Sequence, residues 1–150
     1  MENQLIDTPP EIKPQSQDQQ PGLETEMTPK PIYDTDDPGY GRLKDKVAII
    51  TGGDSGIGRA VAIQFAKEGA DVAIVYLNED EDAEETAAGV RKYGREALLQ
   101  PADISEEENC KNVVERTIEK FGRLDIVVNN AAVQYEQHDI QDITAAQLEY

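Results

Sequence analysis

The sequence has very few of the residues that build metal sites and disulfides. It contains one cysteine, one histidine and no tryptophan in 150 residues. Cys110 alone cannot form an internal disulfide, and His138 alone cannot supply a histidine-based metal site. We therefore predict no metal centre, and we expect Cys110 to be a small packing residue rather than a nucleophile. We expect His138 to lie in a solvated loop.

Basic residues are also scarce, and apolar runs are short. Fourteen Lys and Arg against 31 Asp and Glu give a formal net charge of -17. Excess negative charge makes nucleic acid and anionic membranes unsuitable partners. No apolar run approaches the roughly 20 residues that a transmembrane helix needs. The composition predicts a cytoplasmic protein with one modest core.

Proline is almost absent after residue 39, whereas seven of the eight prolines lie before it. Such a segment cannot bury enough apolar area to offset the entropy of ordering it. We predict a disordered or extended arm over 1–39 and a folded part over 40–150. Two interpretations of residues 26–40 stay open: a solvated tail, or an arm that wraps a neighbouring subunit. The anchors of such an arm would be Ile32, Tyr33 and Tyr40.

A glycine-rich turn separates an apolar run over 47–50 from a helical pattern over 59–67. A strand, a glycine turn and a helix form the context that a dinucleotide-phosphate site requires. Gly52 would permit the tight turn, Gly56 would let backbone approach a diphosphate, and Gly58 would let the helix pack closely. The N-terminus of the helix would offer N–H groups to phosphate. The alternative is a plain strand-to-helix turn without a ligand.

Strand and helix patterns alternate along the rest of the chain. We predict strands over 71–77, 97–100 and 124–128. The run over 71–77 is continuous rather than alternating, which is typical of a parallel strand covered on both faces. Glycines at 94 and 122 end the two helices between them. We predict an α/β fold, a Rossmann-type doubly wound parallel sheet with strand order 3-2-1-4. The ligand crevice would lie between strands 1 and 4, where the order reverses.

Three polar stretches mark the expected starts of helices. The acidic run over 78–82 suits the positive end of a helix, and a solvated helix start is favoured over a metal site. Ser105 with Glu108 predicts one capping box, and Thr144 with Gln147 predicts another.

Four sequence motifs occur together in the folded part. They are T-G-x-x-x-G-I-G over 51–58, Asp103 after the third strand, F-G-R-L-D over 121–125 and N-N-A-A over 129–132. In combination they resemble the short-chain dehydrogenase/reductase family over about 43–150, and the whole chain resembles its bacterial general stress protein subgroup. The resemblance implies an oxidoreductase that transfers hydride between NAD or NADP and an alcohol or carbonyl substrate. It also implies a homo-oligomeric full-length parent, a dimer or tetramer.

The resemblance implies a cofactor site built from four stretches. Asp103 would contact the adenine ring, and the N-N-A-A stretch would steady the sheet and line the crevice. Ala132 stands where the family has glycine, and its methyl group slightly crowds the crevice. The candidate cofactor-binding residues are Gly52, Asp54, Ser55, Gly56, Ile57, Gly58, Tyr76, Leu77, Asn78, Asp103, Ile104, Asn130, Ala131 and Ala132.

The positions that select the cofactor are not decisive. The family's acidic residue for the ribose of NAD falls on Tyr76, and the basic residues for the NADP phosphate would fall near Ser55 or Leu77. Asn78 or the acidic run after it could contact the ribose instead. Fixed negative charge disfavours a 2'-phosphate. We therefore expect weak discrimination with a slight preference for NAD.

The family's catalytic Tyr-x-x-x-Lys pair does not occur after the fourth strand. Tyr40 is the one tyrosine with Lys four residues later, but Tyr40 and Lys44 precede the glycine turn and therefore do not match the family's pair. We assign no catalytic residue and interpret the chain as the N-terminal part of a longer enzyme, inactive by itself. Two alternatives stay open: a nucleotide-binding regulatory module without catalysis, and an epimerase or dehydratase on the same scaffold.

Overall fold

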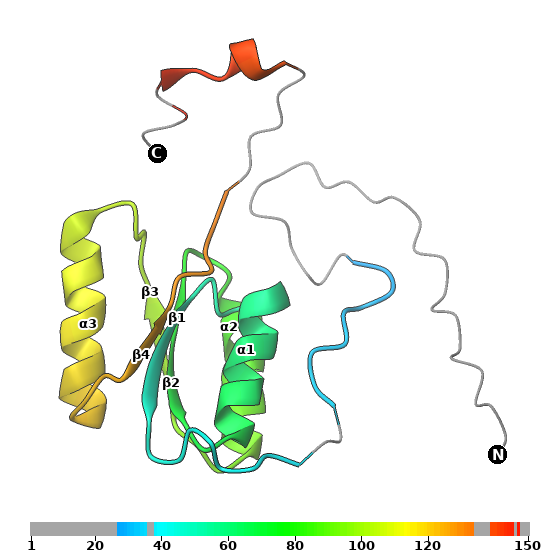
Figure 1. Ribbon diagram of the computed structural model, residues 1–150, viewed down its shortest axis with the longest axis vertical. Coiled ribbons are helices and arrows are strands. Elements are labelled where there is room, and N and C mark those ends of the chain that lie inside the picture. The colour runs from blue at the N-terminus through cyan, green and yellow to red at the C-terminus, as the bar shows by residue number, and fades with distance from the viewer. Residues whose placement is uncertain (1–26, 36–37, 134–138, 146, 148–150) are drawn as a thin grey trace, which may run out of the picture.

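The computed structural model describes residues 27–35, 38–133, 139–145 and 147 (Figure 1). Most of the predicted arm, and also His138, lie outside these residues. None of the described helices has both the length and the apolar content that a membrane span requires. The elements are β1 (Val47–Thr51), α1 (Gly56–Lys67), β2 (Asp71–Tyr76), α2 (Asp80–Lys92), β3 (Ala97–Pro101), α3 (Glu107–Phe121), β4 (Ile126–Val128) and a short 3-10 helix (Ile140–Asp142).

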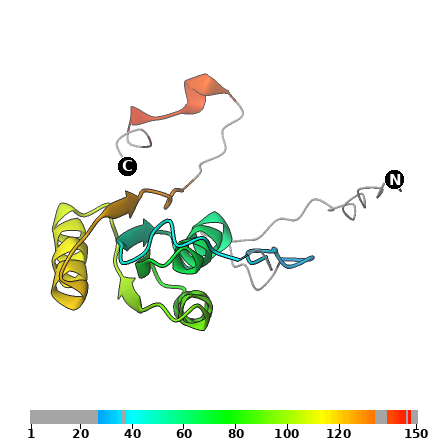
Figure 2. The same ribbon diagram turned by 60° about the horizontal axis from the view of Figure 1, so that its bottom comes forward.

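The four strands form one parallel sheet in the order β3-β2-β1-β4, which confirms the predicted topology. Helices α1 and α2 cover one face and α3 covers the other, as the two views show (Figures 1 and 2). This three-layer arrangement follows from right-handed strand-helix-strand connections. It brings the carboxyl ends of all four strands to the same edge of the sheet.

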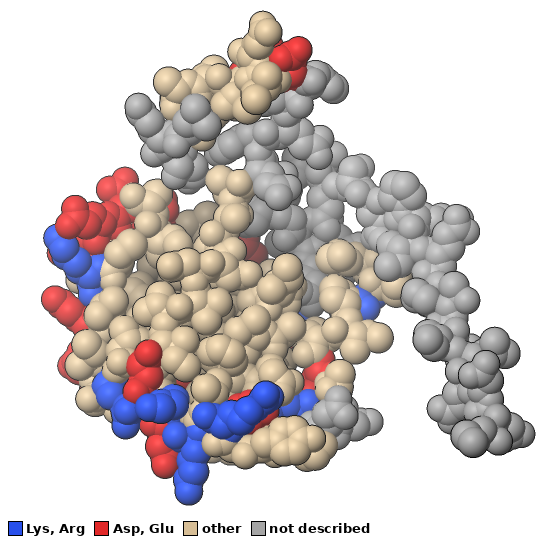
Figure 3. All heavy atoms as spheres, viewed as in Figure 1, with Lys and Arg blue, Asp and Glu red and all other residues tan. Residues whose placement is uncertain are grey.

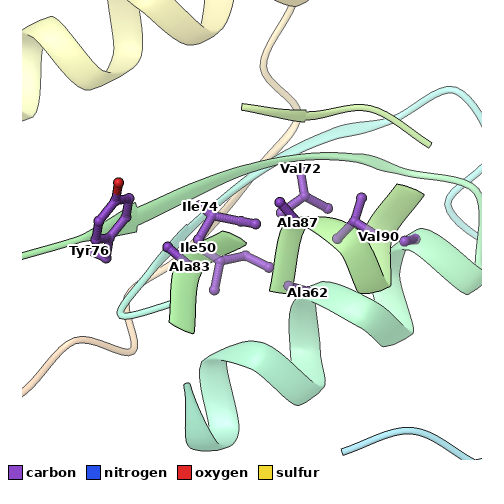
Figure 4. Packing of buried hydrophobic residues seen from close by; sticks show 9 residues of the cluster. Ile50, Ala62, Val72, Ile74, Tyr76, Ala83, Ala87 and Val90 are labelled. Carbon is purple, nitrogen blue, oxygen red and sulfur yellow. The ribbon is translucent and has the colours of Figure 1, made fainter. Parts of the chain in front are cut away.

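The core is divided by the sheet, because successive strand residues point to opposite faces. Ile50, Ile74 and Tyr76 pack against the alanine-rich faces of α1 and α2 (Figure 4). Ile49 and Val75 point the other way, toward α3. Continuous apolar runs in β1 and β2 therefore reflect burial on both sides, as predicted.

The α3 and β4 side of the molecule is less completely covered. Val114 and Ile118 on α3 are 36% and 46% exposed, and Val127 on β4 is 51% exposed. Within the described residues β4 pairs only with β1. Much of the surface in Figure 3 is correspondingly uncharged. The sheet thus ends on an apolar edge strand, a type of edge that favours association.

Element ends differ from the predictions at several places. Helix α1 begins at Gly56 rather than 59, and β4 begins at Ile126 rather than 124. The predicted Ser105 cap is wrong: Glu106 is the N-cap of α3, and the Ser105 hydroxyl donates to Asp103 instead (2.7 Å). The capping box at Thr144 is confirmed by its reciprocal bonds with Gln147.

Tyr33 and Asp34, from the described residues before β1, contact α1 and α2. The Tyr33 hydroxyl donates to Glu85 (2.9 Å), whereas Ile32 and Tyr40, the other two proposed anchors, are 91% and 78% exposed. Asp34 forms ion pairs with Lys67 and Lys92 near the ends of the two helices. Tyr33 and Asp34 therefore bind the chain's own helices.

Glu68, directly after α1, anchors the lead-in to β1. Its side chain accepts bonds from the backbone N–H groups of Tyr40 and Arg42 and from the Arg42 guanidinium. The Arg42 side-chain bond is the main reason that the pKa of Glu68 falls to about 2. The folded-state pKa lies below the unfolded value, so Glu68 stabilises the fold above about pH 4.5, and this contribution is lost as the pH falls toward 2.

We expect Glu68→Gln to flatten the dependence of stability on pH between about 4.5 and 2. Thermal unfolding midpoints at pH 3 and pH 6 measure this difference. Glu84→Gln is the matched control, because Glu84 pairs with Arg91 on the surface, where both side chains are more than half exposed. An equal flattening in both variants would contradict the assignment.

Candidate functional site

A cleft of about 530 Å³ lies at the carboxyl ends of the strands. These strand ends are toward the top of the sheet in Figure 1. Residues that follow each of the four strands line the cleft, and the described segments over 51–57, 75–79, 102–105 and 130–133 contribute. Twelve of the fourteen predicted site residues are among the lining residues, and Gly58 and Asn78 are not. The chain topology therefore brings together stretches that are far apart in the sequence.

The two later glycines of the turn have different structural roles. A Cβ on Gly58 would lie 1.8 Å from the carbonyl oxygen of Gly52, so α1 can approach the turn only without a side chain there. A Cβ on Gly56 would meet no atom within 4 Å, although φ is +52°. Gly58 therefore permits close packing of α1 against the turn, and Gly56 keeps the surface of the cleft free of a side chain.

Asn130 and Thr51 join the end of β1 to the segment after β4. The Asn130 side-chain amide donates to the carbonyls of Thr51 and Gly52, both at 3.0 Å. The Thr51 hydroxyl oxygen in turn accepts from the backbone N–H groups of Asn130 and Ala131. These bonds fix the turn across the boundary between β1 and β4. Thr51 is not among the site residues predicted from the sequence. Its position between the first strand and the glycine turn could have indicated that it contributes to the site.

The N-terminus of α1 faces the cleft without a side-chain cap. Ser55 is the N-cap residue, but it makes no capping hydrogen bond. Amide groups in the first turn of a helix have no partner within the helix, and an anion satisfies them well. Asp54, just before Ser55, is only 7% exposed, and burial raises the pKa of its carboxyl group.

The end of β2 supplies an acidic side chain that sequence reasoning did not single out. Glu79 lines the cleft, and the backbone N–H of Asn78 donates to its carboxylate (3.2 Å). The Tyr76 hydroxyl donates to Asp80 (2.7 Å), and burial together with this bond raises the pKa of Tyr76 to about 12. The Tyr76 hydroxyl therefore stays protonated, and its bond to Asp80 holds the side chain in place at the side of the cleft. The acidic run after the strand was the signal for Glu79.

Asp103 holds the loop between β3 and α3. Its Oδ1 accepts from the backbone N–H and the hydroxyl of Ser105, and these bonds lower the pKa of Asp103. Asn109 donates to the Asp103 carbonyl (2.8 Å). The carboxylate is thus ionised and oriented at the rim of the cleft, where it can accept a hydrogen bond from a ligand.

No lysine or arginine is among the described residues that line the cleft. On the face shown in Figure 3, most Lys and Arg side chains gather along the lower edge, away from the carboxyl ends of the strands. A phosphate group in the cleft would therefore depend on backbone amides and the dipole of α1 rather than on a cation.

Comparison with known proteins gives a consistent result. A family model described as short chain dehydrogenase matches residues 46–150. General stress protein 39 of Bacillus subtilis is 54% identical over 145 residues, 96% of this chain and 51% of that protein. This match confirms the predicted similarity to general stress proteins. The chain spans about half the length of the curated relatives it matches.

Two solved structures resemble this one at a TM-score of 0.66. A short chain dehydrogenase from Burkholderia cenocepacia in complex with NADP is 41% identical, and the match covers 72% of this chain and 44% of that one. Carveol dehydrogenase from Mycobacterium avium in complex with NAD is 32% identical, with 71% and 43% covered. The family model, the sequence relatives and the fold agree, and this chain belongs to the short chain dehydrogenase family.

Proposed function

We propose that this chain forms the dinucleotide-binding half of an NAD(P)-dependent oxidoreductase that acts on an alcohol or carbonyl substrate. The observation that carries the proposal is the cleft at the strand ends, where a glycine turn meets the N-terminus of α1 and the Ser55 side chain makes no capping bond. The solved relatives with NADP and NAD support it. The bound nicotinamide would supply the hydride chemistry.

The residues of the cleft fit a dinucleotide in size and in chemistry. Its volume, about 530 Å³, lies within the range of roughly 300–1,000 Å³ that is usual for such sites. The diphosphate would lie over the open surface at Gly56, and the adenosine near Asp103. Ile57 is 76% and Leu77 49% exposed, and a ligand would cover this apolar surface at the cleft. Asn130–Ala132 would line the nicotinamide side.

We infer a slight preference for NAD over NADP. Glu79 and Asp103 line the cleft, and the described lining residues include no cation to neutralise a 2'-phosphate. A doubly charged phosphate near fixed carboxylates is electrostatically unfavourable. The division into an arm over 1–39 and a binding part over 40–150, the homo-oligomeric parent and the cytoplasmic location also remain proposals.

We expect Gly56→Val in the full-length protein to weaken dinucleotide binding at least tenfold, about 1.4 kcal/mol. A side chain at this position would project into the cleft, where nothing else lies within 4 Å of its Cβ. Calorimetric titrations with NAD and with NADP measure the effect and the cofactor preference together. The wild type should bind NAD at least as tightly as NADP.

Gly94→Val is the matched control, because Gly94 also has a positive φ (+72°) and an open Cβ position, but lies after α2, away from the cleft. It should lose similar stability and keep its affinity. If the wild type binds neither dinucleotide, the proposed function is wrong. Unchanged affinity in a folded Gly56→Val protein would show that the phosphate groups do not bind at Gly56.

A further inference from the structure

Arg59 is a buried cation directly behind the glycine turn. It follows Gly58 in α1, and it is only 1% exposed. Its Nε donates to the backbone carbonyl of Asp54 (2.9 Å) and to the Thr86 hydroxyl oxygen (3.0 Å). Thr86 also donates to the Asp54 carbonyl (2.7 Å). The turn is therefore held from behind by side chains of α1 and α2.

The far end of the same guanidinium reaches acidic groups of α2. One terminal nitrogen of Arg59 donates to the Asp82 carboxylate (3.1 Å), and the other donates to Glu85 (3.1 Å). A planar guanidinium can hold several partners in fixed directions at once. Arg59 thus connects the backbone of the turn rigidly to α2.

Tyr33, from the segment before β1, completes this environment. Its ring centroid lies 5.0 Å from the Arg59 Cζ atom, which is within range of a cation–π contact. Its hydroxyl donates to Glu85, which also accepts from Arg59. Residues 30–34 border a cavity of about 220 Å³ together with Arg59, Asp82 and Glu85. The segment therefore lies against the guanidinium that holds the turn.

We propose that residues 30–34 position the phosphate-binding turn through the contact between Tyr33 and Arg59. Tyr33 is a positioning residue, because it touches Arg59 and lies outside the residues that line the cleft. Removing its ring admits water to the guanidinium, loosens the Arg59 side chain and frees the Asp54 carbonyl to reorient. The segment thereby tunes dinucleotide affinity from outside the cleft. This inference rests on the dinucleotide function proposed above.

The test compares three variants of the full-length protein: Tyr33→Ala, Tyr33→Phe and Tyr40→Ala. Tyr40 also precedes β1 but lies outside residues 30–34, and its ring centroid is 5.9 Å from the Cζ atom of a different arginine, Arg42. Tyr33→Ala should weaken NAD binding in calorimetry by roughly three- to tenfold and speed hydrogen exchange of the amides over 54–58. Tyr33→Phe keeps the ring and should stay within about twofold of wild type. Tyr40→Ala should change neither quantity.

The measurements separate this inference from the proposed function. A wild type that binds no dinucleotide rejects the proposed function, while the exchange rates still decide whether Tyr33 restrains the turn. Unchanged exchange over 54–58 in Tyr33→Ala overturns the inference. Equal losses of affinity in Tyr33→Ala and Tyr40→Ala also overturn it, because they would show only a general loosening of the residues before β1.

Discussion

Replacing Arg59 by methionine is expected to lower the free energy of unfolding by about 3–5 kcal/mol. Asp82 is 4% exposed, and the Arg59 and Asp82 side chains form an ion pair of 3.1 Å. Methionine fills similar space but leaves this carboxylate buried without its cation. An uncompensated buried charge is much more costly than the loss of an exposed pair. Chemical denaturation of the full-length protein measures the change.

Two further variants test whether the loss of stability comes from the buried ion pair between Arg59 and Asp82. Arg91→Met removes an ion pair with Glu84 whose side chains are 52% and 63% exposed, and it should cost less than about 1 kcal/mol. Arg59→Met combined with Asp82→Asn should recover part of the loss, because both charges are then gone. If Arg59→Met costs no more than Arg91→Met, Arg59 does not stabilise the fold through buried charge.

Gly58→Ala is the second substitution with a large expected effect, about 3 kcal/mol of lost stability together with loss of dinucleotide binding. The added Cβ would lie 1.8 Å from the Gly52 carbonyl oxygen and 2.8 Å from the Asn130 side-chain nitrogen. Because the nearer contact is backbone, relief requires α1 to move away from the turn. The movement would also break the bonds that Asn130 makes to the end of β1.

Gly56→Ala is the control for this substitution. It adds the same methyl group two residues earlier, with no atom within 4 Å, so only the strain of a positive φ remains, about 1 kcal/mol. Thermal and chemical unfolding of the two variants should therefore differ clearly. Equal stability of both would mean that the close approach of α1 to the turn is not required.

The sheet and the position of the cleft were predictable because the signals are local and repeated. The runs at β1 and β2 are continuous because both faces are covered, and parallel order follows from the helices between them. The glycine spacing located the turn. Since the carboxyl ends of parallel strands meet at one edge, the sequence alone assigns residues as distant as Gly52 and Ala132 to one cleft.

The remaining features depend on contacts that sequence periodicity does not encode. A charged residue in the first turn of a helix, such as Arg59, is normally expected to be exposed to solvent. Its burial is explained only by its ion pairs with the carboxylates of α2. Ser105 had a suitable partner three residues later, but Asp103 is closer and competes for its hydroxyl. Tyr33 stands in a proline-rich stretch without periodicity, so its contact with Arg59 was not foreseeable.

The bonds from Asn130 to the end of β1 span 79 and 78 residues of chain. During synthesis at roughly 5–20 residues per second, the glycine turn leaves the ribosome about 4–16 s before Asn130 can reach it. Loop closure over such a distance also makes the docking of β4 a late step in folding. Arg59 and Thr86 can hold the Asp54 side of the turn before Asn130 is synthesised, but Thr51 and Gly52 wait for Asn130. We therefore expect dinucleotide binding to arise only after β4 has joined β1.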